Sequence, residues 1–142
     1  MKTTILRVGG LTLVAVALAP AALPAASAQM CKPAIEIKSN LRGKNVIATP
    51  SKLGIYYWDT EKKAGGKIRC TGACLKAWPA VYAKGPVDKH VKGVMATFGT
   101  IKRGSRLQLT VNGLPAYTYH GDTAGVVKCD GVDGWHAVRA AG

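Results

Sequence analysis

Apolar and polar residues alternate along several short segments of the chain, and this pattern predicts β-strands. Residues 34–38 and 106–111 alternate with a period of two, which is typical of strands that bury one face. Residues 52–60 are rich in aromatic and β-branched residues, which favour strands. Further short strands or extended stretches are predicted at 45–49, 68–70, 94–102, 114–119 and 135–139.

Turn signals and one short helix complete the pattern. Asn112-Gly113 stands between two predicted strands and is the strongest short signal for a hairpin. Residues 73–78 are the best helix candidate, which Pro79 ends after one or two turns. Turns and loops are predicted at 62–67, 83–92 and 121–134. The chain is therefore predicted to be all-β or β-rich, with one short helix and no long amphipathic helix.

The first 28 residues have the pattern of a secretory signal peptide. Two basic residues precede an apolar run, and Ala26-Ser27-Ala28 offers a small-residue cleavage site before Gln29. Two prolines interrupt the apolar run, which is shorter than the ~20 apolar residues that a membrane-spanning helix needs. The residues before Cys31 match a lipoprotein signal poorly, so lipid anchoring is not expected. We predict an exported protein, periplasmic or secreted, whose mature form begins at Gln29.

The mature chain, residues 29–142, is long enough for one small domain. Without the two basic residues of the leader, 18 basic residues remain against seven acidic ones, so the formal charge is +11. Hydrophobic residues make up 48% of the whole chain, which is too many for a wholly disordered protein. Aromatic residues are few, so the core must use mainly valine, isoleucine, leucine and alanine.

All four cysteines lie in the mature chain, and an exported chain with an even number of cysteines is expected to form disulfides. We expect two bridges, with the pairing left open, among Cys31, Cys70, Cys74 and Cys129. A bridge from Cys31 to Cys129 would close most of the chain and add about 4–5 kcal/mol of stability in the chain-entropy account. Cys70 and Cys74 could meet only across a bend, so Cys70 could instead pair with Cys129.

The two halves of the mature chain carry residue types in the same order, which predicts an internal repeat. Each half has a tyrosine, any residue, an aromatic residue, two residues and an acid, then a cysteine and a Trp-x-Ala-Val sequence. The first unit, about 44–82, contributes Tyr56, Trp58, Glu61, Cys70 and Trp78. The second unit, about 97–140, contributes Tyr117, Tyr119, Asp122, Cys129 and Trp135. We expect the two units to pack on each other as one domain.

These residues also carry a family resemblance. Tyr117, Tyr119 and Asp122 fit the pattern Yx(FWY)xxD, and the first unit fits it with Glu61 in the acidic position. Further matching stretches lie at 65–66, 70–74, 77–79, 112–115 and 134–136. Over about residues 44–140 the chain resembles the secreted-repeat family, described as predicted lipoproteins with this motif. The resemblance implies an exported, β-rich bacterial protein whose biochemical role is not established.

The aromatic residues of each motif are two positions apart, so on a strand they point to the same face. We expect the faces of the two units to pair into an aromatic cluster, with Trp78 and Trp135 packed near the shared core. The acids of the motifs, Glu61 and Asp122, are expected to accept backbone amides in the turns that follow. The alternative is a binding groove lined by the same aromatic residues.

The basic residues suggest a class of partner. They are spread along the chain, but one dense group consists of Lys62, Lys63, Lys67 and Arg69, and a second lies at 102–106. Basic surfaces attract anionic polymers. Export favours an anionic envelope component, with peripheral membrane contact, or an acidic protein, whereas no nucleic-acid-binding motif occurs. The alternative is a solvated basic surface without a partner, and the oligomeric state stays open.

No recognised catalytic motif occurs, so we expect a binding or structural module without a cofactor rather than an enzyme. The alternative is a periplasmic metal-binding or redox protein. A zinc site could draw on Cys70, Cys74, Cys129 and His136. A copper-like site could draw on His120 and His136 together with Met30 or Met95.

Overall fold

The computed structural model describes residue 9 and residues 30–141, so the predicted cleavage before Gln29 and nearly all of the leader lie outside the described residues. The strands are β1 (Ile35–Ile37), β2 (Val46–Ala48), β3 (Tyr56–Trp58), β4 (Tyr82–Ala83), β5 (Phe98–Arg103), β6 (Arg106–Val111), β7 (Leu114–Pro115) and β8 (Trp135–Ala137). The helices are α1 (Asp59–Lys63) and α2 (Ala73–Ala77). These elements make a small β domain with one disulfide, which confirms the predicted fold class.

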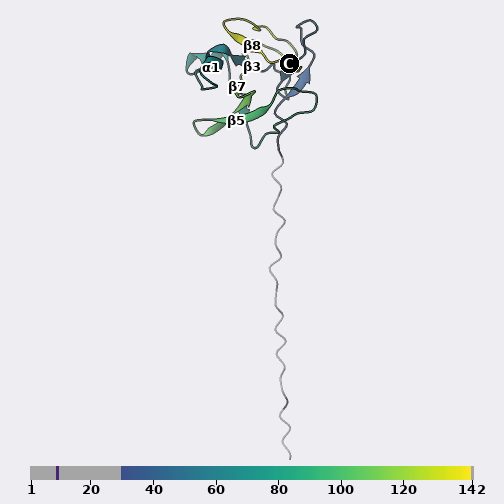
Figure 1. Cartoon of the computed structure of the whole chain (residues 1–142), viewed down its shortest axis with the longest axis vertical. Coiled ribbons are helices and arrows are strands. Elements are labelled where there is room, and N and C mark those ends of the chain that lie inside the picture. Colours follow the sequence, from purple (N-terminus) through teal and green to yellow (C-terminus); the bar gives the residue numbers. More distant parts are fainter. Residues whose placement is uncertain (1–8, 10–29, 142) are drawn as a thin grey trace, which may run out of the picture.

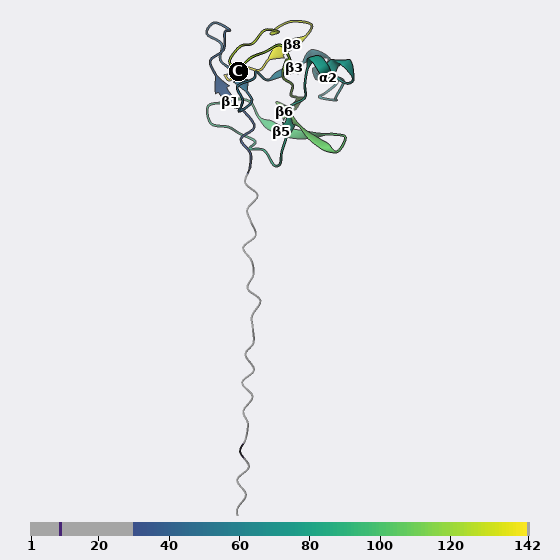
Figure 2. The ribbon, with the colours of Figure 1, turned by 180° about the vertical axis from the view of Figure 1, so that it is seen from behind.

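The strands form three small sheets (Figure 1). β1 pairs with β2 and β3 pairs with β8, both antiparallel. The third sheet has the order β4-β6-β5, and β7 also pairs with β6. The β3–β8 pair brings the middle of the chain against its C-terminal part, and Figures 1 and 2 show these two strands side by side.

The structure contains a helix that the sequence pattern did not predict. The segment 52–60 was expected to be one strand, but β3 ends at Trp58 and α1 begins at Asp59. Acidic side chains in the first turn of α1 and basic ones in its last turn suit the helix dipole, which favours a helix over a longer strand. The described residues therefore have two helices instead of one, and neither is long and apolar enough to cross a membrane.

The predicted hairpin signal is confirmed. Asn112 and Gly113 both have positive φ, at 50° and 77°, and the turn that they form joins β6 to β7. Two residues with positive φ match the twist of the strands that such a turn connects. β5 starts at Phe98, four residues later than predicted, and β7 has only two residues. The stretch 68–70 forms no strand in the described part of the chain.

The two predicted units meet at their motif tyrosines. The backbone amide of Tyr56 donates to the carbonyl of Tyr117 at 2.8 Å, and the reverse bond measures 3.0 Å. On one side of this contact, Val138 donates its amide to Ile55 at 2.8 Å. On the other side, Val81 donates to Ala116 at 3.0 Å. Each Trp-x-Ala-Val segment thus lies beside the motif strand of its counterpart.

The core has two clusters of buried side chains. One is built mainly from aliphatic residues: Ala34, Ile47, Ile55, Val91, Ala96, Phe98, Leu109, Val111, Ala116, Val138 and Ala140. The other contains the buried aromatic residues of the motifs and their neighbours: Val46, Tyr56, Cys70, Trp78, Tyr117, Val127, Trp135 and Ala137. The expected aliphatic core is therefore present, but the aromatic residues form a core of their own.

The expectation of two disulfides is wrong. Among the described residues one bridge forms, between Cys70 and Cys74, while Cys31 and Cys129 are unpaired. Gly72 has a φ of 57° just before α2, and this bend brings the two Cα atoms to 5.3 Å, within the range for a disulfide. Cys31 instead lies exposed beside Pro86, to whose carbonyl its amide donates at 2.9 Å.

Thiol counting tests this pairing. The mature protein should show one fast-reacting thiol in the native state, Cys31, and a second, half-buried one at Cys129 that reacts fully only after unfolding. A thiol reagent applied before and after denaturation without reductant measures both. The Cys31→Ser variant should lose the fast phase, and Cys129→Ser should lose only the slow phase. Absence of thiols in the unreduced, unfolded monomer would contradict the structure.

Candidate functional site

Four aromatic rings stack in a row between the two halves. The Trp135 ring lies between Trp58, at a centroid distance of 5.1 Å and 1° between planes, and Trp78, at 3.9 Å and 6°. Tyr119 continues the row beyond Trp78 at 4.8 Å. The two inner tryptophans are buried, and the two outer rings are half-buried. Motif residues from both halves therefore share one aromatic core.

The motif tyrosine of the first half binds the acid of the second. Tyr56 is fully buried, and its hydroxyl donates to Asp122 Oδ2 at 2.6 Å. The other carboxylate oxygen of Asp122 accepts the amide of Lys128 at 2.9 Å. Burial, followed by the hydrogen bond to Asp122, raises the pKa of Tyr56 well above its ordinary value.

The motif tyrosine of the second half binds the acid of the first in the same way. Tyr117 is fully buried and donates to Glu61 Oε1 at 2.7 Å. The same oxygen accepts the amides of Arg69 at 2.7 Å and Cys70 at 3.0 Å. Burial, followed by the hydrogen bond to Glu61, raises the pKa of Tyr117. Arg103 also donates to the Tyr117 hydroxyl, at 2.9 Å.

These contacts decide what the motif residues can do. Glu61 and Asp122 accept backbone amides of the segments that follow them, and each also accepts a tyrosine hydroxyl from the other half. Because Tyr56 and Tyr117 have no exposed surface, they cannot line an open groove. The arrangement holds the two halves together rather than presenting the motif tyrosines to a ligand.

The dense basic group lies on the surface next to this network. Lys62 and Lys63 end α1, and Lys67 and Arg69 follow in the loop that leads to Cys70; all four cations are exposed. Gly66 has a φ of +83°, and a Cβ there would lie 2.5 Å from the carbonyl oxygen of Gly113. The turn between the lysines therefore packs closely against the β6–β7 turn and requires glycine.

The second basic group joins the first. Arg103 Nη1 donates to the carbonyl of Cys70 at 2.9 Å, and Arg103 Nε donates to Gln108 Oε1 at 2.7 Å. These bonds fix the β5–β6 hairpin, which carries exposed Lys102 and Arg106, against the loop after α1. Figures 1 and 2 both show the tip of this hairpin on the same side of the molecule as the helices. We refer to the exposed cations of the first group as the basic face: Lys62, Lys63, Lys67 and Arg69.

Few carboxylates offset the basic face. Asp88 is the sole acid in the sequence between Glu61 and Asp122, a stretch that holds eleven lysines and arginines. Glu61 is fully buried; its Oε1 accepts three hydrogen bonds, whereas its Oε2 has no partner among the described residues. Asp59 lies 2.9 Å from His136 Nε2, and this contact lowers the pKa of the Asp59 carboxyl. Lys62 and Lys63 also help to lower the pKa of Asp59, but within the described part of the chain no cation of the basic face forms an ion pair with a carboxylate.

The proposed metal ligands are dispersed. Cys70 and Cys74 are joined in a disulfide, so the zinc set that would use both thiolates is wrong. His136 contacts Asp59, whereas His120 is exposed and stacks edge-on against Tyr119. Across the described residues, no group of three or more histidine, cysteine, aspartate or glutamate side chains comes close enough to hold a metal ion.

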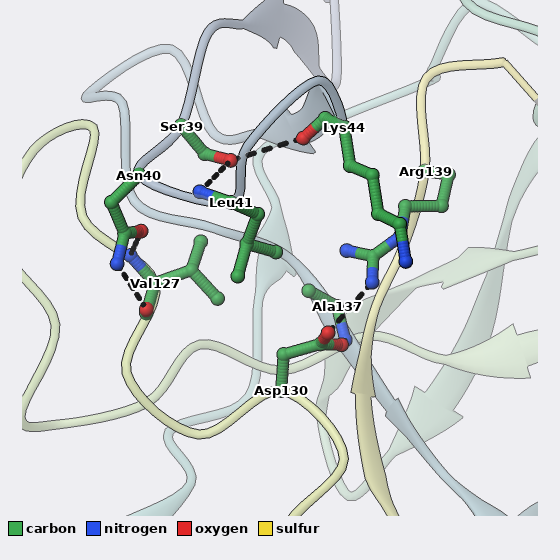
Figure 3. A network of polar contacts seen from close by, with 8 residues as sticks. All are labelled: Ser39, Asn40, Leu41, Lys44, Val127, Asp130, Ala137 and Arg139. Atoms are coloured by element: carbon green, nitrogen blue, oxygen red, sulfur yellow. Dashed lines mark hydrogen bonds and ion pairs between the residues drawn. The ribbon is translucent and has the colours of Figure 1, made fainter.

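The structure also reveals polar contacts that the sequence did not single out (Figure 3). Asn40 pairs with the backbone of Val127 in both directions, at 2.8 and 3.1 Å. Asp130 accepts the amide of Ala137 at 2.9 Å and the guanidinium of Arg139 at 2.6 Å. Burial opposes ionisation of Asp130, but these two donors outweigh it and lower its pKa. Together these bonds anchor the long 121–134 loop. In the sequence, Asn40 and Asp130 have the pattern of ordinary turn residues, so neither was singled out.

Comparison with protein-family models, with curated proteins and with solved structures yields no match to this chain.

Removal of the Tyr56 or the Tyr117 hydroxyl should lower the stability of the fold. Tyr56→Phe and Tyr117→Phe should each lower the free energy of unfolding by about 1.5–3 kcal/mol, since each removes a hydrogen bond to a buried carboxylate. Urea denaturation measures the change. Tyr57→Phe is the matched control, because Tyr57 is half-buried and stacks on His136; it should change stability by less than about 0.5 kcal/mol. Equal losses of stability in all three variants would contradict the Tyr56–Asp122 and Tyr117–Glu61 hydrogen bonds between the halves.

The same hydroxyls predict a loss of stability at alkaline pH. Their pKa values are raised in the folded state, so above about pH 10 the unfolded chain binds fewer protons and stability falls as the pH rises. Each tyrosine contributes a slope of roughly 1.4 kcal/mol per pH unit. Tyr56→Phe should therefore have a shallower decline than the parent by about this amount, since all other groups are shared. Equal slopes would show that Tyr56 ionises while folded.

Proposed function

We propose that the protein is an exported, envelope-associated binding module that attaches through its basic face to anionic envelope material. The observation that carries this proposal is the set of exposed cations in α1 and in the loop after it, next to acids that are buried or already bound. Anionic phospholipid headgroups and anionic cell-wall polymers present the complementary charge. The module acts by binding, without catalysis.

The secreted-repeat interpretation is part of the proposal. The backbone bonds around Tyr56 and Tyr117 have counterparts in both halves, which supports two related units of the Yx(FWY)xxD type. A disulfide suits an oxidising compartment, and it supports the reading of residues 1–28 as a cleaved leader. In this view the motif residues build the scaffold, and the surface cations perform the binding.

The attraction is electrostatic and therefore depends on salt. The Debye length falls from about 10 Å at 0.1 M salt to about 3 Å at 1 M, so cations on an exposed face lose most of their attraction over this range. A basic residue near an anionic membrane surface contributes about 1 kcal/mol. The four residues of the basic face together contribute about 4 kcal/mol at low salt, roughly a thousandfold in the binding constant, so attachment is reversible.

The test is co-sedimentation of the mature protein with vesicles that contain phosphatidylglycerol, with neutral vesicles, and with anionic cell-wall fragments, across a salt series. Binding should be confined to the anionic material and should fall at least tenfold between 0.1 and 1 M salt. Simultaneous substitution of Lys62, Lys63, Lys67 and Arg69 by glutamine should weaken binding at low salt by roughly a hundredfold or more.

A variant with the same change in net charge provides the control. Lys38, Lys44, Lys89 and Lys92 are also exposed but lie outside the basic face, and their substitution by glutamine should weaken binding far less. Equal effects of the two variants would mean that net charge, and not this face, drives attachment. Binding that persists at 1 M salt would contradict the electrostatic account altogether.

A further inference from the structure

A cavity of about 440 Å³ lies beside β4 and is bordered by residues 31–33 and by the turn at 49–51. Cys31 donates its amide to Pro86 at 2.9 Å, and Asp88 donates its amide back to Cys31 at 3.2 Å. These two bonds hold residues 31–33 along the segment that follows β4, with the turn at 49–51 opposite. The volume falls within the range of small-molecule binding sites.

The floor of the cavity is apolar. Val81, Val87 and Leu109 contribute to it, and all three belong to or pack against the aliphatic core. Its wall is also fixed in place, because Tyr82 pairs with Gln108 in the third sheet and the Arg106 guanidinium lies 3.3 Å from the centre of the Tyr82 ring. A wall held by strand pairing and by a cation–π contact is formed before any ligand arrives.

The rim of the cavity is cationic. Lys32 and Lys84 are exposed and lie on two different segments that border the cavity. None of the described residues that line it is acidic. An apolar floor below uncompensated ammonium groups is complementary to a molecule that has one hydrocarbon chain and one anionic head.

We propose that this cavity binds a single-chain amphiphile with an anionic head, of the fatty-acid type. The chain lies against Val81, Val87 and Leu109, and the head stays near the ammonium groups of Lys32 and Lys84. Free fatty acids and single-chain phospholipids share this chemistry. The site uses none of the residues of the basic face, so it adds a second activity to the proposed attachment and does not depend on it.

Three probes with the same hydrocarbon chain and different head groups separate the contribution of the chain from that of the head-group charge. Isothermal titration of the mature protein with decanoate, decanol and decyltrimethylammonium, each below its micelle concentration, should give affinities in that order. The series octanoate, decanoate and dodecanoate should tighten by about fourfold per added methylene for as long as the chain remains inside the cavity. Lysophosphatidylglycerol in place of decanoate then distinguishes the two sources of the head group.

Variants assign the binding to this cavity. The double substitution Lys32→Gln and Lys84→Gln should weaken decanoate binding about three- to tenfold and leave decanol binding unchanged. The matched control is Lys89→Gln with Lys92→Gln, both exposed and outside the cavity, which should leave both probes unaffected. Ala83→Trp fills the cavity and should abolish binding of both probes. Ser51→Trp repeats this test from the exposed turn, where a substitution does not disturb the core.

Three results would overturn the proposal: equal affinity for the anionic and cationic probes, no effect of chain length, or decanoate binding that survives both tryptophan variants. The four-residue variant of the basic face should keep its decanoate affinity. The Lys32 and Lys84 variant should keep its salt-sensitive attachment to anionic vesicles. Failure of either activity therefore leaves the other to be judged separately.

Discussion

The crossed hydrogen bonds between motif tyrosines and motif acids are the constraint on which the rest of the structure depends. A buried carboxylate is costly unless hydrogen-bond donors compensate for the lost water. Glu61 has the Tyr117 hydroxyl and two backbone amides on one oxygen, and Asp122 has the Tyr56 hydroxyl and one amide. Each acid thus fixes the loop that follows it and, through the tyrosine, the strand of the other half.

The position of the basic face follows from this constraint. The side chain of Glu61, which belongs to α1, accepts the amides of Arg69 and Cys70. The loop that carries Lys67 must therefore fold back over the buried acid. The Arg103 bond to Cys70 then draws the β5–β6 hairpin to the same place. The same hydrogen bonds therefore bury the Glu61 carboxylate and leave the cations of the following loop on the surface.

The sequence predicted the features that depend on local chemistry. Alternation located β1 and β6, Asn112-Gly113 located the turn, and the repeated motif identified residues that the structure places in one aromatic core. It did not predict features that depend on contacts between distant residues. The helix α1 replaces a strand because Glu61 must turn inward to meet Tyr117, which lies 56 residues away.

Other contacts left no sign that a single sequence could reveal. The choice of Cys74 as the partner of Cys70 depends on the backbone bend at Gly72, and the pairing of Asn40 with Val127 joins positions 87 residues apart. The cavity beside Cys31 is formed by four segments of ordinary composition that are far apart in the sequence. Such features arise only when tertiary structure brings the segments together.

The crossing of the two pairs also bears on how the chain is assembled. Tyr56 donates to Asp122 while Tyr117 donates to Glu61. Such a reciprocal arrangement is typical of a two-fold symmetric dimer interface, and here it forms within one polypeptide. A fragment ending before Tyr117 would keep an acid without its hydroxyl donor and a tyrosine without its acceptor. Neither half has all its hydrogen-bond partners alone, so we expect the two halves to fold together. The linker between them makes this association intramolecular and therefore independent of protein concentration.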